Sequence, residues 1–179
     1  MFSDGIMCKT GEVMEYRLDG KNGEKSHFYR DEIEEIIKEE NIDRNRFAEF
    51  SKFQYDNIIK KFYYAFSDYN HLASAHVTLT RKGLHIRNNI SCFSIVGIYL
   101  AGNWAEYLKA IKAAMPLNAD EKLFLILSEG WVYEGYMDGI FKVLNKTDVW
   151  SEDFFLISRK YDWFIAHVWI DLCAFMYQK

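Results

Sequence analysis

Apolar and polar residues alternate along the C-terminal third of the chain in the manner of half-buried β-strands. These segments are rich in phenylalanine, tyrosine, tryptophan and isoleucine, which favour extended backbone. A turn at 128–130 separates the first two segments, and a short helical pattern begins near Asp138. The pattern predicts an antiparallel sheet with strands at 123–127, 131–136, 154–158 and 163–172, the last two joined as a hairpin.

Helical periodicity dominates the chain before residue 66. In the segment DEIEEIIKEEN, which begins at Asp31, isoleucines recur on one stripe, and acidic residues come early, where they favour the positive end of the helix dipole. Asp43 is placed to cap a second, longer helix, because apolar residues from Phe47 to Ala65 roughly keep helical spacing. The sequence thus predicts a helical pair over about 31–66.

Between these regions, one helix and several strands are expected. Asn103 and Glu106 have the spacing of a capping box, and an apolar stripe continues from there until Pro116, the only proline in the chain. This predicts a helix at 103–115. Strands are expected at 76–84 and 92–100, with a short one at 12–18.

Together these elements predict one α+β domain spanning residues 1–179. Its fold would be a mainly antiparallel sheet with helices packed on it. Within the domain, the helical pair at about 31–66 precedes a sheet-rich part at about 76–179.

The two faces of the expected final strand differ in composition. One face is uniformly apolar and is the better candidate for the core; it carries Phe164, Ala166, Val168, Ile170 and Leu172. The other face mixes rings with polar groups; it carries Trp163, Ile165, His167, Trp169 and Asp171. We expect this mixed face to line a surface patch or groove. The alternative is a second core layer beneath a helix, which would bury both tryptophans equally well.

If neighbouring strands pair, further rings and carboxylates join the mixed face. The candidate partner-binding residues are Trp131, Tyr133, Glu134, Asp162, Trp163, His167, Trp169 and Asp171. Rings and carboxylates on one surface suit a basic protein partner. Solvated carboxylates at a sheet edge are the simpler alternative. A third possibility is a cleft around His167, Asp171 and Glu134 that performs hydrolysis or proton transfer.

No motif assigns catalytic, cofactor-binding or metal-binding residues. The histidines lack the H-E-x-x-H spacing, the serines lack the G-x-S-x-G elbow, and neither glycine-rich phosphate-binding motif occurs. The cysteines Cys8, Cys92 and Cys173 are far apart and include no C-x-x-C pair. We therefore expect no cofactor and no metal.

The composition of the chain limits which classes of partner are expected. A formal net charge of -4 provides no global basic field, so nucleic acid is not expected as a partner. No apolar run is long enough to cross a membrane, and together with the scattered cysteines this predicts a cytoplasmic protein. The aromatic share of 17% exceeds what a core requires, so we expect some rings at the surface, where they anchor protein interfaces.

The chain also resembles a family of small bacterial proteins that are similar to the immunity proteins of polymorphic and contact-dependent toxin systems. Four segments carry the resemblance and cover about the C-terminal 45% of the chain: NWAEYLKAI, LFLILSE, GWVYEGYMDGIFKVL and EDFFLISRKYDWFIA. In such sequences a polar segment with a pair of histidines often follows the last tryptophan. Here that segment is HVWIDL, which keeps Asp171 but has Trp169 and Ile170 in place of the histidines.

The resemblance implies a cytosolic α+β domain that binds a toxin domain and blocks it. The expected function is therefore that of a non-enzymatic binding protein, an immunity protein with a cognate toxin as its partner. Two alternatives stay open, namely a small hydrolase-like enzyme and a self-assembling structural module.

Overall fold

The computed structural model describes residues 27–66, 77–80, 83–86, 94–99, 103–116, 120–147, 152–168 and 173–178. Their helices are α1 (Phe28–Glu39), the 3-10 turn η1 (Lys52–Gln54), α2 (Tyr55–Phe66), α3 (Trp104–Ala114) and α4 (Met137–Leu144). Their strands are β1 (Phe47–Glu49), β2 (Val77–Thr80), β3 (Gly83–Ile86), β4 (Ser94–Ile98), β5 (Lys122–Leu127), β6 (Val132–Tyr136), β7 (Phe154–Ser158), β8 (Trp163–Val168) and β9 (Cys173–Gln178).

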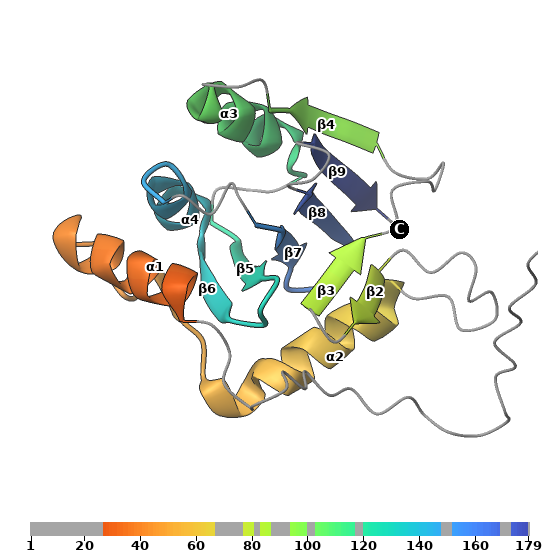
Figure 1. Cartoon of the computed structure of the whole chain (residues 1–179), viewed down its shortest axis with the longest axis horizontal. Helices are drawn as coiled ribbons and strands as arrows, with labels where there is room; N and C mark the ends of the chain where they lie inside the picture. Colours follow the sequence, from red (N-terminus) through yellow and green to blue (C-terminus); the bar gives the residue numbers. More distant parts are fainter. Residues whose placement is uncertain are drawn as a thin grey trace, which may run out of the picture.

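Within these segments, seven strands form one sheet in the order β1-β6-β5-β7-β8-β9-β4, and β2 pairs with β3 in a separate hairpin. Each neighbouring pair in the large sheet is antiparallel. The four α-helices of the described part pack against this sheet (Figure 1). The predicted single-domain α+β fold with a mainly antiparallel sheet is therefore confirmed.

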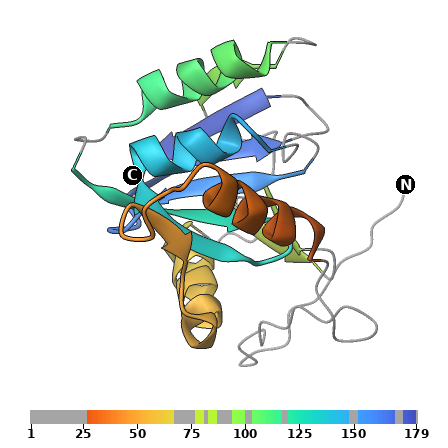
Figure 2. The same ribbon diagram turned by 90° about the vertical axis from the view of Figure 1, so that its left-hand side faces the viewer.

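Helices cover both faces of the sheet. Figures 1 and 2 show α1, α4 and α3 side by side on one face, and α2 with the β2–β3 hairpin on the other. On the α2 face, the Phe62 ring lies 5.4 Å from that of Phe155 and 5.3 Å from that of Phe164. On the opposite face, the indole of Trp104 meets the ring of Phe154 at 6.4 Å. Central strands such as β7 and β8 are consequently buried on both sides.

Several predicted elements match closely. The strand at 154–158 is β7, and the strands predicted at 123–127 and 131–136 are β5 and β6 within one residue. The predicted helix at 103–115 is α3, and the side chain of Asn103 caps it by accepting a hydrogen bond of 3.3 Å from the backbone N–H of Glu106. The segment at 92–100 contains β4, and 76–84 is divided between β2 and β3. The strand predicted at 12–18 lies outside the described residues.

The expected helix from Asp43 to Ala65 is partly wrong. Its first half forms β1, which pairs with β6, and α2 begins only at Tyr55. Asp43 belongs to a turn, where its carboxylate accepts hydrogen bonds from the backbone and side chain of Asn45. The physical reason lies far along the chain: the Phe47 ring stacks on that of Tyr133 at 5.2 Å, and this burial outweighs a weak helical pattern.

The expected final strand is also wrong in length. Its first part, β8, ends at Val168, and β9 begins at Cys173 and runs back antiparallel to it. Residues 169–172 are outside the described part of the chain. A third strand thus follows the two of the predicted C-terminal hairpin, and β9 connects β8 to β4.

Gly135 allows the close approach of β1 to β6. A Cβ atom at this position would lie 2.6 Å from the carbonyl oxygen of Arg46 and 2.7 Å from Cδ2 of Phe47. We expect Gly135→Ala to lower the free energy of unfolding by about 2 kcal/mol, because backbone has to move. Gly97→Ala is the control, since its Cβ would meet ring carbons of Tyr107 at 3.2 Å, which a small shift relieves. Urea unfolding should rank the two variants in this order, and an equal or larger loss for Gly97→Ala would contradict the close approach.

Candidate functional site

The structure corrects the expectation for the mixed face of β8. His167 is fully buried and lines no exposed patch, whereas Trp163, although only 3% exposed, is one of the residues that line a notch at the end of the sheet. The alternation of the strand is as predicted, but helix α3 covers the mixed face. The second core layer beneath a helix is therefore the correct alternative for His167, while Trp169 and Asp171 lie outside the described residues.

His167 is held in an aromatic cage. Its Nδ1 atom lies 2.6 Å from the hydroxyl oxygen of Tyr107, and its ring stacks on Phe154 at 4.9 Å. The indole of Trp104 meets the imidazole edge-on at 5.6 Å. Burial raises the pKa of Tyr107 well above its ordinary value, so this hydroxyl stays neutral. These contacts bury a polar group with a hydrogen-bond partner, as a stable core requires.

The proposed enzyme cleft is not assembled from the residues that the structure describes. The strand register places Glu134 on the same face as Phe164, which α2 covers. His167 is an odd number of residues from Phe164 on the same strand and therefore lies on the opposite face. The sheet itself separates Glu134 from His167.

Glu134, whose side chain is 15% exposed, and the exposed Asp162 lie near the same end of the sheet. The carboxylate of Glu134 forms ion pairs with Lys122 at 3.5 Å and with Arg159 at 3.3 Å. Asp162 is exposed and accepts a hydrogen bond from the hydroxyl of Ser158. Nearby lies a notch of about 460 Å³, lined by Pro116, Glu121, Lys122, Ser158, Arg159, Lys160, Asp162, Trp163 and Gln178. Its charges of both signs give it no clear preference for an anion or a cation.

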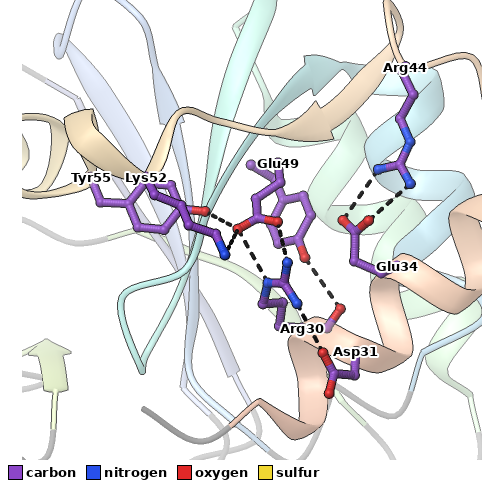
Figure 3. A network of polar contacts seen from close by, with 8 residues as sticks. Arg30, Asp31, Glu34, Arg44, Glu49, Lys52 and Tyr55 are labelled. Carbon is purple, nitrogen blue, oxygen red and sulfur yellow. Dashed lines mark hydrogen bonds and ion pairs between the residues drawn. The ribbon is translucent and has the colours of Figure 1, made fainter. Parts of the chain in front are cut away.

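Trp131 directly precedes β6, and Tyr133 lies within it, on the face of the sheet opposite to that of its neighbour Glu134. Tyr133 is joined to a network of polar contacts among Arg30, Glu49 and Tyr55 (Figure 3). Arg30 of α1 donates two hydrogen bonds to the carboxylate of Glu49, from Nε at 3.3 Å and from Nη2 at 2.8 Å. The hydroxyl of Tyr55 donates to the same carboxylate at 2.5 Å, and that of Tyr133 donates to the backbone carbonyl of Arg30 at 3.4 Å. One carboxylate thus ties α1, β1 and α2 together.

Burial and hydrogen bonds set the ionisation states of the groups in this network. Burial alone would raise the pKa of Glu49, but the bonds from Arg30 and Tyr55 outweigh it and hold that pKa below its ordinary value. Burial raises the pKa of Tyr55 and of Tyr133 well above the usual range for tyrosine. The network therefore contains a stable carboxylate and neutral hydroxyls near neutral pH, with no group prepared to exchange a proton.

The indole of Trp131 is surrounded by side chains from the first helices and the segment just before α2. It is 5% exposed, and two cations lie over it, the guanidinium carbon of Arg30 at 5.2 Å and Nζ of Lys52 at 5.8 Å from the ring centroid. The ring of His27 packs on it at 4.9 Å and that of Tyr55 at 6.1 Å.

Two exposed rings belong to residues that directly follow the groups packed on Trp131. Phe28 follows His27 directly and is 67% exposed, and Phe53 follows Lys52 directly and is 100% exposed. We call the region that carries these two rings the Phe28–Phe53 surface. Large apolar side chains held in water on a rigid support are typical of protein-binding surfaces.

Sequence reasoning singled out Trp131 and Tyr133 but missed the residues that surround them. Glu49 and Phe53 belong to a region that the sequence assigned to an ordinary helix, and Arg30 directly precedes the first predicted helix. No local pattern marks Phe53 as exposed, because a phenylalanine in a helical stripe reads as core.

The described part of the chain contains no cluster of three or more histidine, cysteine or acidic side chains that could hold a metal ion. Among the described helices, none is both long and apolar enough to span a membrane. A family model described as "Family of unknown function (DUF6756)" matches residues 25–179. No curated protein and no solved structure matches the chain.

Proposed function

The chain belongs to DUF6756, a family of unknown function, and we propose that it is a non-enzymatic binding protein, an immunity protein that binds a cognate bacterial toxin domain and blocks it. The observation that carries this proposal is the Phe28–Phe53 surface. Phe53 is fully exposed although a phenylalanine gains about 1.5–3 kcal/mol by burial, so a partner that covers it gains that free energy on binding.

The hydrogen-bond network that holds the Phe28–Phe53 surface favours tight binding. The part-buried bonds of Glu49 to Arg30 and Tyr55 fix the segments that carry Phe28 and Phe53 before any partner arrives. A preorganised surface loses little conformational entropy on association, and this raises affinity. An inhibitor that must act quickly on a toxin benefits from such rigidity.

Charge and sequence resemblance also support the proposal. The net charge of -4 suits a basic partner, since complementary charge speeds encounter. The resemblance of the C-terminal segments to immunity-like proteins points to the same role. We further propose that the protein acts in the cytoplasm, without nucleic acid or membrane as a partner.

Co-expression of the full chain with the product of the neighbouring gene tests the proposal. If that product is toxic, cells that also make this protein should survive, because the complex removes the active toxin. Cells that make a destabilised variant such as Gly135→Ala should be protected less well at equal expression. Binding without protection, or no binding at all, would contradict the role of an immunity protein.

A further inference from the structure

The helix beside the Phe28–Phe53 surface carries an unbalanced charge. Helix α1 contains five acidic and two basic residues. Its core side is apolar, with Ile33, Ile36 and Ile37 buried. Its outer side continues from Phe28 with the acidic residues Asp31, Glu35 and Glu39, all of them exposed.

The spacing places these acidic groups in one row. Asp31, Glu35 and Glu39 follow one another at intervals of four residues, which corresponds to about 6 Å along a helix axis. Asp31 pairs with Arg30 at 3.1 Å, whereas Glu35 and Glu39 form no ion pair with any residue that the structure describes. Because these distances are below the Debye length of about 10 Å, the charges act together on an approaching molecule.

The cations near the surface balance only part of this row, because the pair of Arg30 with Asp31 leaves Glu35 and Glu39 unpaired among the described residues. Arg30 donates two hydrogen bonds to Glu49 and one to Asp31, and Lys52, whose side chain is 61% exposed, lies 4.0 Å from the Glu49 carboxylate. On the outer side of α1, the three exposed carboxylates Asp31, Glu35 and Glu39 outnumber the one exposed cation, Lys38, so the charge next to Phe28 is negative on balance.

From this arrangement we infer the chemistry of the partner: the Phe28–Phe53 surface docks a cationic protein face, in which an apolar pocket receives the Phe53 ring and arginine or lysine side chains face Asp31 and Glu35. The inference rests on the proposed function, since it names the partner chemistry of the same surface. The apolar rings supply the affinity, and the row of carboxylates selects a basic partner over a neutral or acidic one.

A synthetic peptide of alternating arginine and leucine is a probe that does not depend on any toxin. Titrated into the full-length protein and followed by amide and indole NMR signals, it should shift the signals of Phe28, Phe53 and Trp131. Phe53→Ala should weaken its binding about tenfold. The control is Ile98→Ala, because Ile98 is also an exposed apolar residue, at 59%, but lies on β4 at the far edge of the sheet.

The same titration tests whether the acidic residues of α1 contribute to peptide binding. Glu35→Gln should weaken peptide binding about threefold, and added salt should reduce the difference from the wild type. Glu106→Gln is the matched control, since Glu106 is also exposed on a helix, α3, and should leave binding unchanged. A counterpart peptide with glutamate in place of arginine should not bind.

Four results would overturn the inference: equal binding of the acidic peptide, no binding of the basic one, signal shifts centred on Ile95 and Ile98, or light scattering that shows a dimer in which a second copy covers Phe53. The proposed function can fail separately. The neighbouring gene product could prove harmless while the basic peptide binds as described. That result would support the inferred chemistry of the Phe28–Phe53 surface and contradict the role as an immunity protein.

Discussion

Replacing Phe164 by alanine should lower the free energy of unfolding by about 3–5 kcal/mol, the largest loss expected for any single change considered. Phe164 is fully buried in β8, a strand with neighbours on both sides. Its ring lies 5.3 Å from that of Phe62 and 4.7 Å from that of Phe66, so its removal leaves a cavity between the sheet and α2. Urea unfolding followed by far-ultraviolet circular dichroism measures the loss.

Phe53→Ala provides the matched control for this prediction. The same atoms are removed, but from a ring that is 100% exposed, so the free energy of unfolding should change by no more than about 0.5 kcal/mol. Equal losses for Phe164→Ala and Phe53→Ala would mean that α2 does not pack on this face of the sheet.

Glu49→Ala should cost about 3 kcal/mol in unfolding free energy, the second largest expected effect. The side chain of Glu49 is 15% exposed and that of its partner Arg30 is 21% exposed, so the change leaves a half-buried guanidinium without its bidentate acceptor. It also removes the acceptor of the Tyr55 hydroxyl. Asp31→Ala is the control: Asp31 pairs with the same arginine but is 65% exposed, and its loss should cost less than about 1 kcal/mol.

The loss of unfolding free energy caused by Glu49→Ala should become smaller as the pH falls into the acid range. Because the pKa of Glu49 in the folded protein lies below the ordinary value of 4.5, its stabilising effect is complete above that value and is lost as the pH falls through the lowered pKa. The difference between wild type and Glu49→Ala should therefore be constant near neutral pH and shrink in acid below 4.5. A difference that grows in acid would contradict an ionised Glu49 in the folded state.

The local sequence pattern was sufficient to predict those elements whose structure depends on residues close by in the sequence. Helix α3 was predictable because Asn103 caps it and Pro116 follows it, and β7 because an aromatic run is bounded by polar residues. Strand β1 was not predictable, because it exists through contacts of Phe47 with residues nearly ninety positions later, at Tyr133 and Gly135. A helical spacing of phenylalanines says nothing about such distant partners.

The candidate site was predictable only in part for a similar reason. Strand alternation correctly separated Trp163 and His167 from Phe164, but alternation cannot tell a solvated face from one that a helix covers. Trp131 was chosen from the sequence as a partner-binding residue, and this stays a prediction; the groups that surround it come from the first helices of the structure. Only the fold places Arg30 over its ring and leaves Phe53 in solvent.

The most direct test of the central claim is survival of cells that express the neighbouring gene product as a toxin together with wild type, Phe53→Ala or Ile98→Ala. Both variants remove an exposed apolar side chain, so both should stay folded and accumulate to the same level. The account predicts that wild type and Ile98→Ala protect the cells and that Phe53→Ala protects them poorly. Full protection by Phe53→Ala, or loss of protection with Ile98→Ala alone, would contradict the claim that the Phe28–Phe53 surface binds the toxin.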